Sequence, residues 1–292
     1  MEELATILIR GLGTGSVFAL LAMSLNVIYN ASGILNFAQG HLLVVAGVFA
    51  YLWYPAGGSV AMWFLTLFAV AAAAAVIAGL QGFLTLLPLR SSVEQHSWIV
   101  TTLAASIIMG ALITLTMGPN ALIVKDPFGN FSFAGTQVPY TYIGLVVLTV
   151  LAYLGLRWFQ RSFLVGLALN ALSQDLDAAR AAGASTRRLQ VLAFVIAGIV
   201  LGLSGFLGAS VIGISESSAL QYLIYGFIVA VVGGLGNNTG ALIAGPIFGV
   251  LLMYVTYQAG NQLQTPLAVA VIVAVLMLRP QGVFGRLHAR RV

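Results

Sequence analysis

The sequence contains no cysteine, only one lysine and few charged residues of either sign. Among its 292 residues there are 12 basic and 7 acidic side chains. Without cysteine, the chain can form neither a disulfide framework nor a cysteine-ligated metal site. The three histidines, His41, His96 and His288, are scattered and lack the spacing of metal ligands. Because the single lysine, Lys125, does not follow a glycine-rich GxxxxG pattern, the chain has no P-loop for ATP.

Long stretches without charge dominate the sequence. Residues 11–89 and 217–278 contain no charged residue, 60% of all residues are hydrophobic, and the mean hydropathy is +1.04. A helical bilayer crossing needs about 20 apolar residues, so each stretch can hold several crossings. A soluble domain has no use for so much apolar surface. The composition therefore predicts an all-α, polytopic helical membrane protein with a single transmembrane domain over residues 1–292.

The apolar segments alternate with short breaks of turn-forming residues. Two breaks, at 30–33 (NASG) and 234–240 (GLGNNTG), are rich in glycine and asparagine, and polar side chains that would lie at membrane depth follow the first. We therefore expect about eight to nine membrane segments, one or two of them broken or re-entrant. The segments are predicted at residues 12–29, 33–53, 60–88, 98–117, 141–156, 190–212, 219–235, 241–258 and 265–278.

Small residues recur four positions apart in several of these segments. This spacing places them on one helix face and lets membrane helices approach closely. We interpret them as contact positions of a tightly packed bundle. The pairs are Gly11/Gly15, Gly198/Gly202, Ser204/Gly208 and Gly245/Gly249.

The arginines predict the orientation of the chain in the membrane. Even numbers of segments separate their groups, so nearly all of them can lie on one side, which the positive-inside rule makes cytoplasmic. Lys125 then lies outside, Arg10 is the exception, and the C-terminus is cytoplasmic. Because this rule accounts for the basic pI of about 9.7, no nucleic-acid partner is expected. The arginines on the common side are Arg90, Arg157, Arg161, Arg180, Arg187, Arg188, Arg279, Arg286, Arg290 and Arg291.

Residues 170–190, with the sequence NALSQDLDAARAAGASTRRLQ, form a compact polar interruption past the centre of the chain. Ser173 can cap a helix start, the following run favours helix, and Gly183 can end it. We predict a cytoplasmic helix of about two to three turns within this coupling loop. A solvated linker is the alternative, but a capped, alanine-rich helix is suited to docking in a groove of another protein. The predicted docking residues are Asp175, Ala178, Ala179, Ala182 and Gly183, with the three alanines on one helix face.

The first break offers the best candidate for a substrate path. A helix that breaks inside the membrane exposes backbone groups that can bind polar ligands. Asn36 and Gln39 could hydrogen-bond a zwitterion or could only satisfy neighbouring helices, and His41 fits a buried hydrogen-bonding role. The predicted substrate path consists of Asn36, Phe37, Gln39, Gly40 and His41.

The acidic residues bear on the energy source. A proton-coupled carrier needs carboxylates or histidines within its spans. All seven acidic residues are expected at segment ends or in loops, so no carboxylate proton relay is predicted. A sodium-coupled carrier stays open, because backbone carbonyls can bind sodium.

Three blocks of the sequence carry a family resemblance: GLGTGSVFALLAMSLNVIYNASGILNFAQGHLLVVAGVFA, NALSQDLDAARAAGASTRRLQVLAF and VVGGLGNNTGALIAGPIFGVL. They resemble, in the same order, blocks of the permeases of ABC importers for branched-chain amino acids, the LivH-like family. The resemblance covers essentially the whole chain. One position departs from the pattern, because the family often has an acidic residue where this chain has His41.

The resemblance implies a permease subunit of the bacterial cytoplasmic (inner) membrane that is not itself an enzyme. It implies pairing with a second, related permease, with two ABC ATPase subunits beneath the pair and an extracytoplasmic substrate-binding protein outside. In such transporters the coupling helix docks on the ATPase. The chain would bind no cofactor itself, and the partner subunits would use the ATP.

The solute and the class of transporter stay open at this level. Related permeases are expected to differ in solute, so urea, amides and aromatic acids are alternatives to branched-chain amino acids. A self-sufficient secondary carrier or channel for a small polar solute is a second class, and a membrane scaffold without transport is a third. A neighbouring ATPase and binding protein would distinguish the first class from the others.

Overall fold

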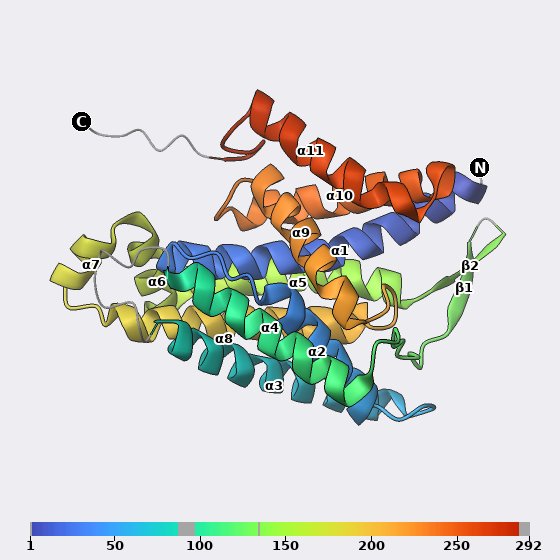
Figure 1. The fold of residues 1–292 in the computed structure, drawn as a ribbon, viewed down its shortest axis with the longest axis horizontal. Helices are drawn as coiled ribbons and strands as arrows, with labels where there is room; N and C mark the ends of the chain where they lie inside the picture. The colour runs from blue at the N-terminus through green and yellow to red at the C-terminus, as the bar shows by residue number, and fades with distance from the viewer. Residues whose placement is uncertain (1, 87–96, 134, 286–292) are drawn as a thin grey trace.

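The protein is described by a computed structural model that covers residues 2–86, 97–133 and 135–285, so four of the arginines assigned above (Arg90, Arg286, Arg290 and Arg291) lie outside the described residues. The chain forms a bundle of long helices with very little sheet (Figure 1). This architecture confirms the predicted all-α class. The helices are α1 (Glu2–Ser32), α2 (Gln39–Trp53), α3 (Val60–Leu86), α4 (Ser97–Met117), α5 (Thr141–Ser162), α6 (Leu164–Gln174), α7 (Leu176–Ala181), α8 (Thr186–Gly208), α9 (Glu216–Val232), α10 (Asn238–Ala259), η2 (Asn261–Leu263) and α11 (Gln264–Leu278).

Each of the nine predicted apolar segments corresponds to a helix. Within the described residues, seven helices are long and apolar enough to cross a membrane, which makes the chain a polytopic membrane protein. The last of the seven is α11 together with the adjoining η2, which gives 18 residues over Asn261–Leu278. The other two, α2 and α9, have 15 and 17 residues and are shorter than a full crossing. The prediction of about eight to nine segments therefore resolves into seven long helices and two short ones.

The bundle has two ends, which lie at opposite sides of Figure 1. One end carries α7 and the ends of α5 and α11, and the other carries the N-terminus and a β-hairpin. We name them the α7 end and the hairpin end. Arg10, the arginine that the sequence analysis set apart from the others, belongs to the first turns of α1, whose N-terminus lies at the hairpin end. The arginines of the described residues that belong to elements at the α7 end are Arg157, Arg161, Arg180, Arg187, Arg188 and Arg279.

The hairpin was not expected from the sequence. Strands β1 (Asn130–Phe133) and β2 (Thr136–Pro139) pair antiparallel, with Asn130 opposite Pro139 and Phe133 opposite Thr136. Between α4 and the hairpin, Leu122 forms a single bridge to Ile214, which ties the α4–β1 connection to the segment before α9.

Three of the four predicted small-residue pairs mark close helix contacts; at the fourth, a Cβ on Gly208 would meet only side chains, with Val17 nearest at an ordinary 3.5 Å. Gly11 and Gly15 of α1 face Gly245 and Gly249 of α10, and a Cβ on Gly15 would overlap the Gly245 carbonyl oxygen. On the opposite side of the bundle, Gly198 of α8 lies against α3 in the same way. Backbones in contact gain dispersion energy, which replaces the hydrophobic effect as a driving force in lipid.

The first predicted break is present between α1 and α2. Gly33 has a φ of 69° and ends α1, with its amide donating to the Tyr29 carbonyl at 2.8 Å. The next residues are not helical, and α2 begins only at Gln39. Asn36, within this link, is 1% exposed. Irregular backbone is therefore buried inside the protein, the setting in which membrane proteins tolerate it.

The second predicted break is a capped turn between α9 and α10. Gly234 and Gly236 have φ values of 88° and 82°, which allow the tight reversal. Asn237 caps α10, because its side-chain oxygen accepts hydrogen bonds from the amides of Thr239 and Gly240. Asn237 is therefore a turn residue.

Candidate functional site

Asn36 forms a closed amide pair with Gln81 of α3. The Gln81 Nε2 donates to Asn36 Oδ1 at 2.7 Å, and the Asn36 Nδ2 donates to Gln81 Oε1 at 3.2 Å. The Asn36 oxygen also accepts from the amide of Ala38 at 3.0 Å. Both side chains are buried, so each satisfies the polar groups of the other. This geometry favours a packing role for Asn36, in which it fastens the link before α2 to α3.

We expect Asn36→Leu to lower the stability of the folded permease. The change leaves the buried Gln81 amide without its partner, which costs about 1–3 kcal/mol. In detergent, the thermal midpoint should fall for Asn36→Leu and recover in the double variant Asn36→Leu/Gln81→Leu, where both polar groups are removed. An unchanged midpoint for the single variant would contradict the packing role.

Gln39 differs from Asn36 because part of its amide has no partner. Its side chain is fully buried at the first turn of α2, and its Oε1 accepts from Ser24 Oγ at 3.3 Å. The Nε2 has no hydrogen-bond partner among the described residues. A buried donor left unpaired is costly, and such groups call for a functional or structural explanation. Gln39 therefore offers a free N–H donor inside the bundle.

Phe37 and Gly40 shape the site without offering a side-chain polar group. The ring of Phe37 stacks on Trp98 of α4, with centroids 6.1 Å apart and planes within 3°. Gly40 lies directly against α9, where a Cβ would overlap the Ala219 carbonyl oxygen and come within 2.9 Å of Leu223 Cβ. Glycine at position 40 thus allows α2 and α9 to touch.

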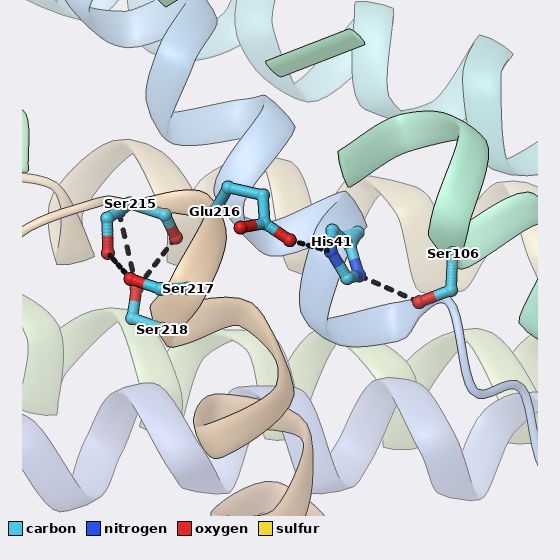
Figure 2. Close-up of polar contacts among 6 residues, drawn as sticks. All are labelled: His41, Ser106, Ser215, Glu216, Ser217 and Ser218. Carbon is cyan, nitrogen blue, oxygen red and sulfur yellow. Dashed lines mark hydrogen bonds and ion pairs between the residues drawn. The ribbon is translucent and has the colours of Figure 1, made fainter. Parts of the chain in front are cut away.

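His41 joins two helices other than its own (Figure 2). Its Nδ1 lies 2.7 Å from Ser106 Oγ of α4, and its Nε2 lies 3.8 Å from Glu216 Oε1 at the start of α9. The His41 side chain is 12% exposed and that of Glu216 is 41% exposed. The histidine is therefore a largely buried hydrogen-bonding group, close to what the sequence predicted, and it also faces a carboxylate.

The Glu216 carboxylate lies beside the interior of α4. A Cβ on Gly110 of α4 would lie 3.2 Å from Glu216 Oε1 and 2.9 Å from His41 Nε2. Gly110 precedes the end of α4 at Met117 by seven residues, about 10 Å at 1.5 Å per residue. Glu216 is the first residue of α9, so it lies at a segment end, as predicted. Its carboxylate nevertheless reaches the middle part of α4 beside Gly110, which the sequence did not indicate.

Sequence analysis missed Glu216, although a local signal was present. Ser215 and Ser218 form a capping box at the start of α9, in which the Ser218 hydroxyl contacts the Ser215 amide at 3.2 Å and carbonyl at 2.8 Å. A capping serine followed by a long apolar run predicts a helix start, and Glu216 directly follows this cap, so the sequence places it in the first helical turn. The sequence does not show that this turn packs beside Gly110 of α4.

The coupling loop forms a shorter helix than predicted, with a different cap. Helix α7 has six residues, and Asp175 precedes it, with its Oδ1 accepting from the Ala178 amide at 2.9 Å. Ser173 belongs to α6, and its hydroxyl donates to the Asn170 carbonyl, so the prediction that Ser173 caps the helix is wrong. Gly183 has a φ of 89° and follows the helix as the predicted stop.

The three alanines do not share one exposed face. Ala179 is only 7% exposed and packs into the core of its own chain, so the prediction that it faces outward is wrong. Ala178 and Ala182 are exposed, and so is Asp175. A six-residue helix lying on the bundle must bury one side, and Ala179 is on that side. The surface that remains open to a partner includes Asp175, Ala178 and Ala182.

A polar cavity opens at the α7 end. It has a volume of about 1320 Å³ and is lined by the ends of α1, α5 and α9 and the start of α10. Arg157 donates to the Tyr153 hydroxyl at 3.0 Å, and that hydroxyl lies 2.9 Å from Thr239 Oγ1. Arginine, tyrosine and threonine therefore form a hydrogen-bonded wall at this end of the bundle.

Comparisons with known proteins agree on one family. Residues 7–279 match the family model described as "branched-chain amino acid transport system / permease component". The chain is 26% identical to the high-affinity branched-chain amino acid transport system permease protein BraD of Pseudomonas aeruginosa, over 98% of this chain and 97% of the relative. It is also 26% identical to the permease protein LivH of the Escherichia coli system, over 97% and 96%.

A second permease of that E. coli system, LivM, is 25% identical over 91% of this chain and 67% of LivM. No solved structure matches the chain significantly.

Proposed function

Because the chain belongs to the family of branched-chain amino acid transport system permease components, we propose that it is the transmembrane permease subunit of an ABC importer. The subunit forms the translocation path for branched-chain or related amino acids. The family match carries this proposal, because it spans residues 7–279 and so includes almost the whole bundle. The helical membrane fold supports it.

Separate ATPase subunits drive the transport in this proposal. The chain has no P-loop sequence, so two partner subunits bind and hydrolyse the ATP. They dock at the α7 end, where α7 and its two flanking residues expose Asp175, Ala178 and Ala182. A second, related permease completes the path, in keeping with the likeness of this chain to both LivH and LivM. A binding protein delivers the solute at the hairpin end.

The proposed orientation places the α7 end and the C-terminus in the cytoplasm of a bacterium. The arginines that the structure describes at the α7 end support this orientation by the positive-inside rule. The membrane is the cytoplasmic (inner) one, where a binding protein outside and ATP inside are both available. The polar cavity at the α7 end then opens toward the cytoplasm.

Cysteine labelling tests this orientation cleanly, because the native sequence has no cysteine. We expect Ser173→Cys, in α6, to react with a membrane-impermeant thiol reagent only from the cytoplasmic side. Ser132→Cys, in the hairpin, should react only from outside. Both serines are exposed, so the two variants are matched in chemistry and accessibility. Reaction of both from the same side would contradict the orientation.

Uptake measurements test the solute class. Deletion of the gene in its host should abolish high-affinity uptake of labelled leucine, isoleucine or valine, and the wild-type gene should restore it. Parallel measurements with urea, an aliphatic amide and an aromatic acid distinguish the alternative solutes of related permeases. Restored uptake of only one of these alternatives would replace the amino-acid assignment.

One observation favours a second candidate, a self-sufficient proton-coupled carrier. His41 and Glu216 are ionisable groups whose Nε2 and Oε1 atoms lie 3.8 Å apart beside α4, and proton relays use such pairs of ionisable groups. Such a carrier would work without an ATPase. Uptake that follows a proton gradient in the absence of ATP would support it.

A further inference from the structure

Glu216 places its carboxylate beside Gly110 of α4, and none of the described lysines or arginines pairs with it. Among the described residues, its ionic partner is His41, with 3.8 Å between Nε2 and Oε1, too far for a hydrogen bond. The helices that meet at this point, α2, α4 and α9, contain no lysine or arginine. Residues 217–278 also contain no charged side chain. The fold therefore leaves the negative charge of Glu216 open to an external cation.

The fold does not use Glu216 as a structural fastener. The start of α9 is held by the capping box of Ser215 and Ser218, not by the carboxylate (Figure 2). The side chain is 41% exposed, whereas the polar residues that fasten this region, such as Asn36 and Gln81, are buried. An ionisable side chain within the membrane is costly and usually marks a path for an ion or solute.

His41 is oriented toward the carboxylate by a second contact. Ser106 lies 2.7 Å from His41 Nδ1, which fixes the ring so that the opposite nitrogen points at Glu216. Gly110 leaves the room for this arrangement, because a Cβ there would lie within 3.2 Å of both groups. Helix α2 thus contributes the His41 ring, and α4 holds this ring in place beside the Glu216 carboxylate.

We propose that the Glu216 carboxylate binds the positively charged group of the transported solute, with His41, held by Ser106, as its positioning residue. This inference rests on the proposed function, in which the charged group is the ammonium of an amino acid. An ammonium has three N–H donors, and a carboxylate accepts them in charge-assisted hydrogen bonds. During transport, the ammonium of the solute would thus pair with the Glu216 carboxylate, beside which the described residues place no lysine or arginine.

The first test compares Glu216→Gln with Glu216→Asp in the assembled transporter, in vesicles with the binding protein outside and ATP inside. Glu216→Gln keeps the shape and removes the charge, so maximal leucine uptake should fall by about tenfold to a hundredfold. Glu216→Asp should retain most of the rate. The leucine concentration for half-maximal uptake should not change, because the binding protein sets it. Equal maximal rates for wild type and Glu216→Gln would overturn the inference.

The second test measures, without any solute, whether the surroundings of Glu216 attract cationic reagents. Ser217→Cys places an exposed thiol next to Glu216. A cationic methanethiosulfonate should label this variant several-fold faster than an anionic one, and Glu216→Gln in the same background should abolish the preference. Ser132→Cys in the hairpin is the control, whose rate ratio should not respond to Glu216→Gln.

The two tests separate the possible failures. If the wild-type complex imports no amino acid, the proposed function fails, and a cation preference at Ser217→Cys still supports a cation-binding Glu216. If Glu216→Gln loses uptake but Ser217→Cys shows no charge preference, Glu216 acts on the fold, and the inference is overturned.

Discussion

Ala178→Arg is expected to leave the permease folded in the membrane and to weaken its association with the ATPase by about tenfold to a hundredfold. Ala178 is exposed on α7, so a long side chain there meets nothing in its own chain. In the proposed complex it meets the ATPase groove, where overpacking costs about 1–3 kcal/mol and each 1.4 kcal/mol is a factor of ten. Co-purified ATPase activity and uptake should both fall.

Two other alanines serve as comparisons for this prediction. Ala56→Arg changes an exposed alanine in the α2–α3 connection, so it should not affect ATPase association. Ala179→Arg is unsuitable as a docking test, because Ala179 is buried in its own chain and the change would disturb the fold. Wild-type ATPase association for Ala178→Arg would show that α7 only connects α6 to α8.

Gln39→Met is expected to lower maximal uptake by about fivefold to tenfold while the permease stays as stable as the wild type or becomes more stable. Methionine has a similar volume and removes a buried N–H donor that has no hydrogen-bond partner in the described part of the chain. Ser24 loses one acceptor but keeps its hydrogen bond to the Leu21 carbonyl at 2.7 Å. If the free donor serves the solute, the path loses a hydrogen bond of about 0.5–1.5 kcal/mol.

The stability changes of Asn36→Leu and Gln39→Met distinguish a packing residue from a residue of the substrate path. Asn36→Leu should destabilise the fold, because Asn36 has partners within the chain, whereas Gln39→Met should lower uptake without lowering stability. Thermal unfolding in detergent and initial uptake rates in vesicles measure the two quantities. Unchanged uptake by Gln39→Met at wild-type protein levels would limit Gln39 to helix packing.

The sequence predicted the helices because a charge-free apolar run has few other structures in a membrane. Glycines four residues apart also predicted contact positions, and the structure places Gly11 and Gly15 against Gly245 and Gly249. The hairpin at residues 130–139 was missed, since its two strands are only four residues each. The cap of α7 was assigned two residues early, because Ser173 and Asp175 are both good caps and only packing decides between them.

The candidate site was only partly predictable. The break before α2 identified Asn36, Gln39 and His41, and the structure buries the first two and joins the third to another helix. The buried side of α7 could not be found from sequence, because neighbouring alanines give no apolar pattern. Glu216 was missed because its position in the first turn of α9 is local information, whereas its place beside Gly110 depends on how α4 and α9 pack.

Uptake by purified components tests the central claim most directly. The permease pair and its ATPases are placed in sealed vesicles with ATP inside, the binding protein and labelled leucine outside, and no ion gradient. We expect leucine to accumulate inside, and accumulation to stop when ATP is replaced by a non-hydrolysable analogue. Accumulation driven by a proton or sodium gradient in vesicles that contain this chain without ATPase or ATP would contradict the account.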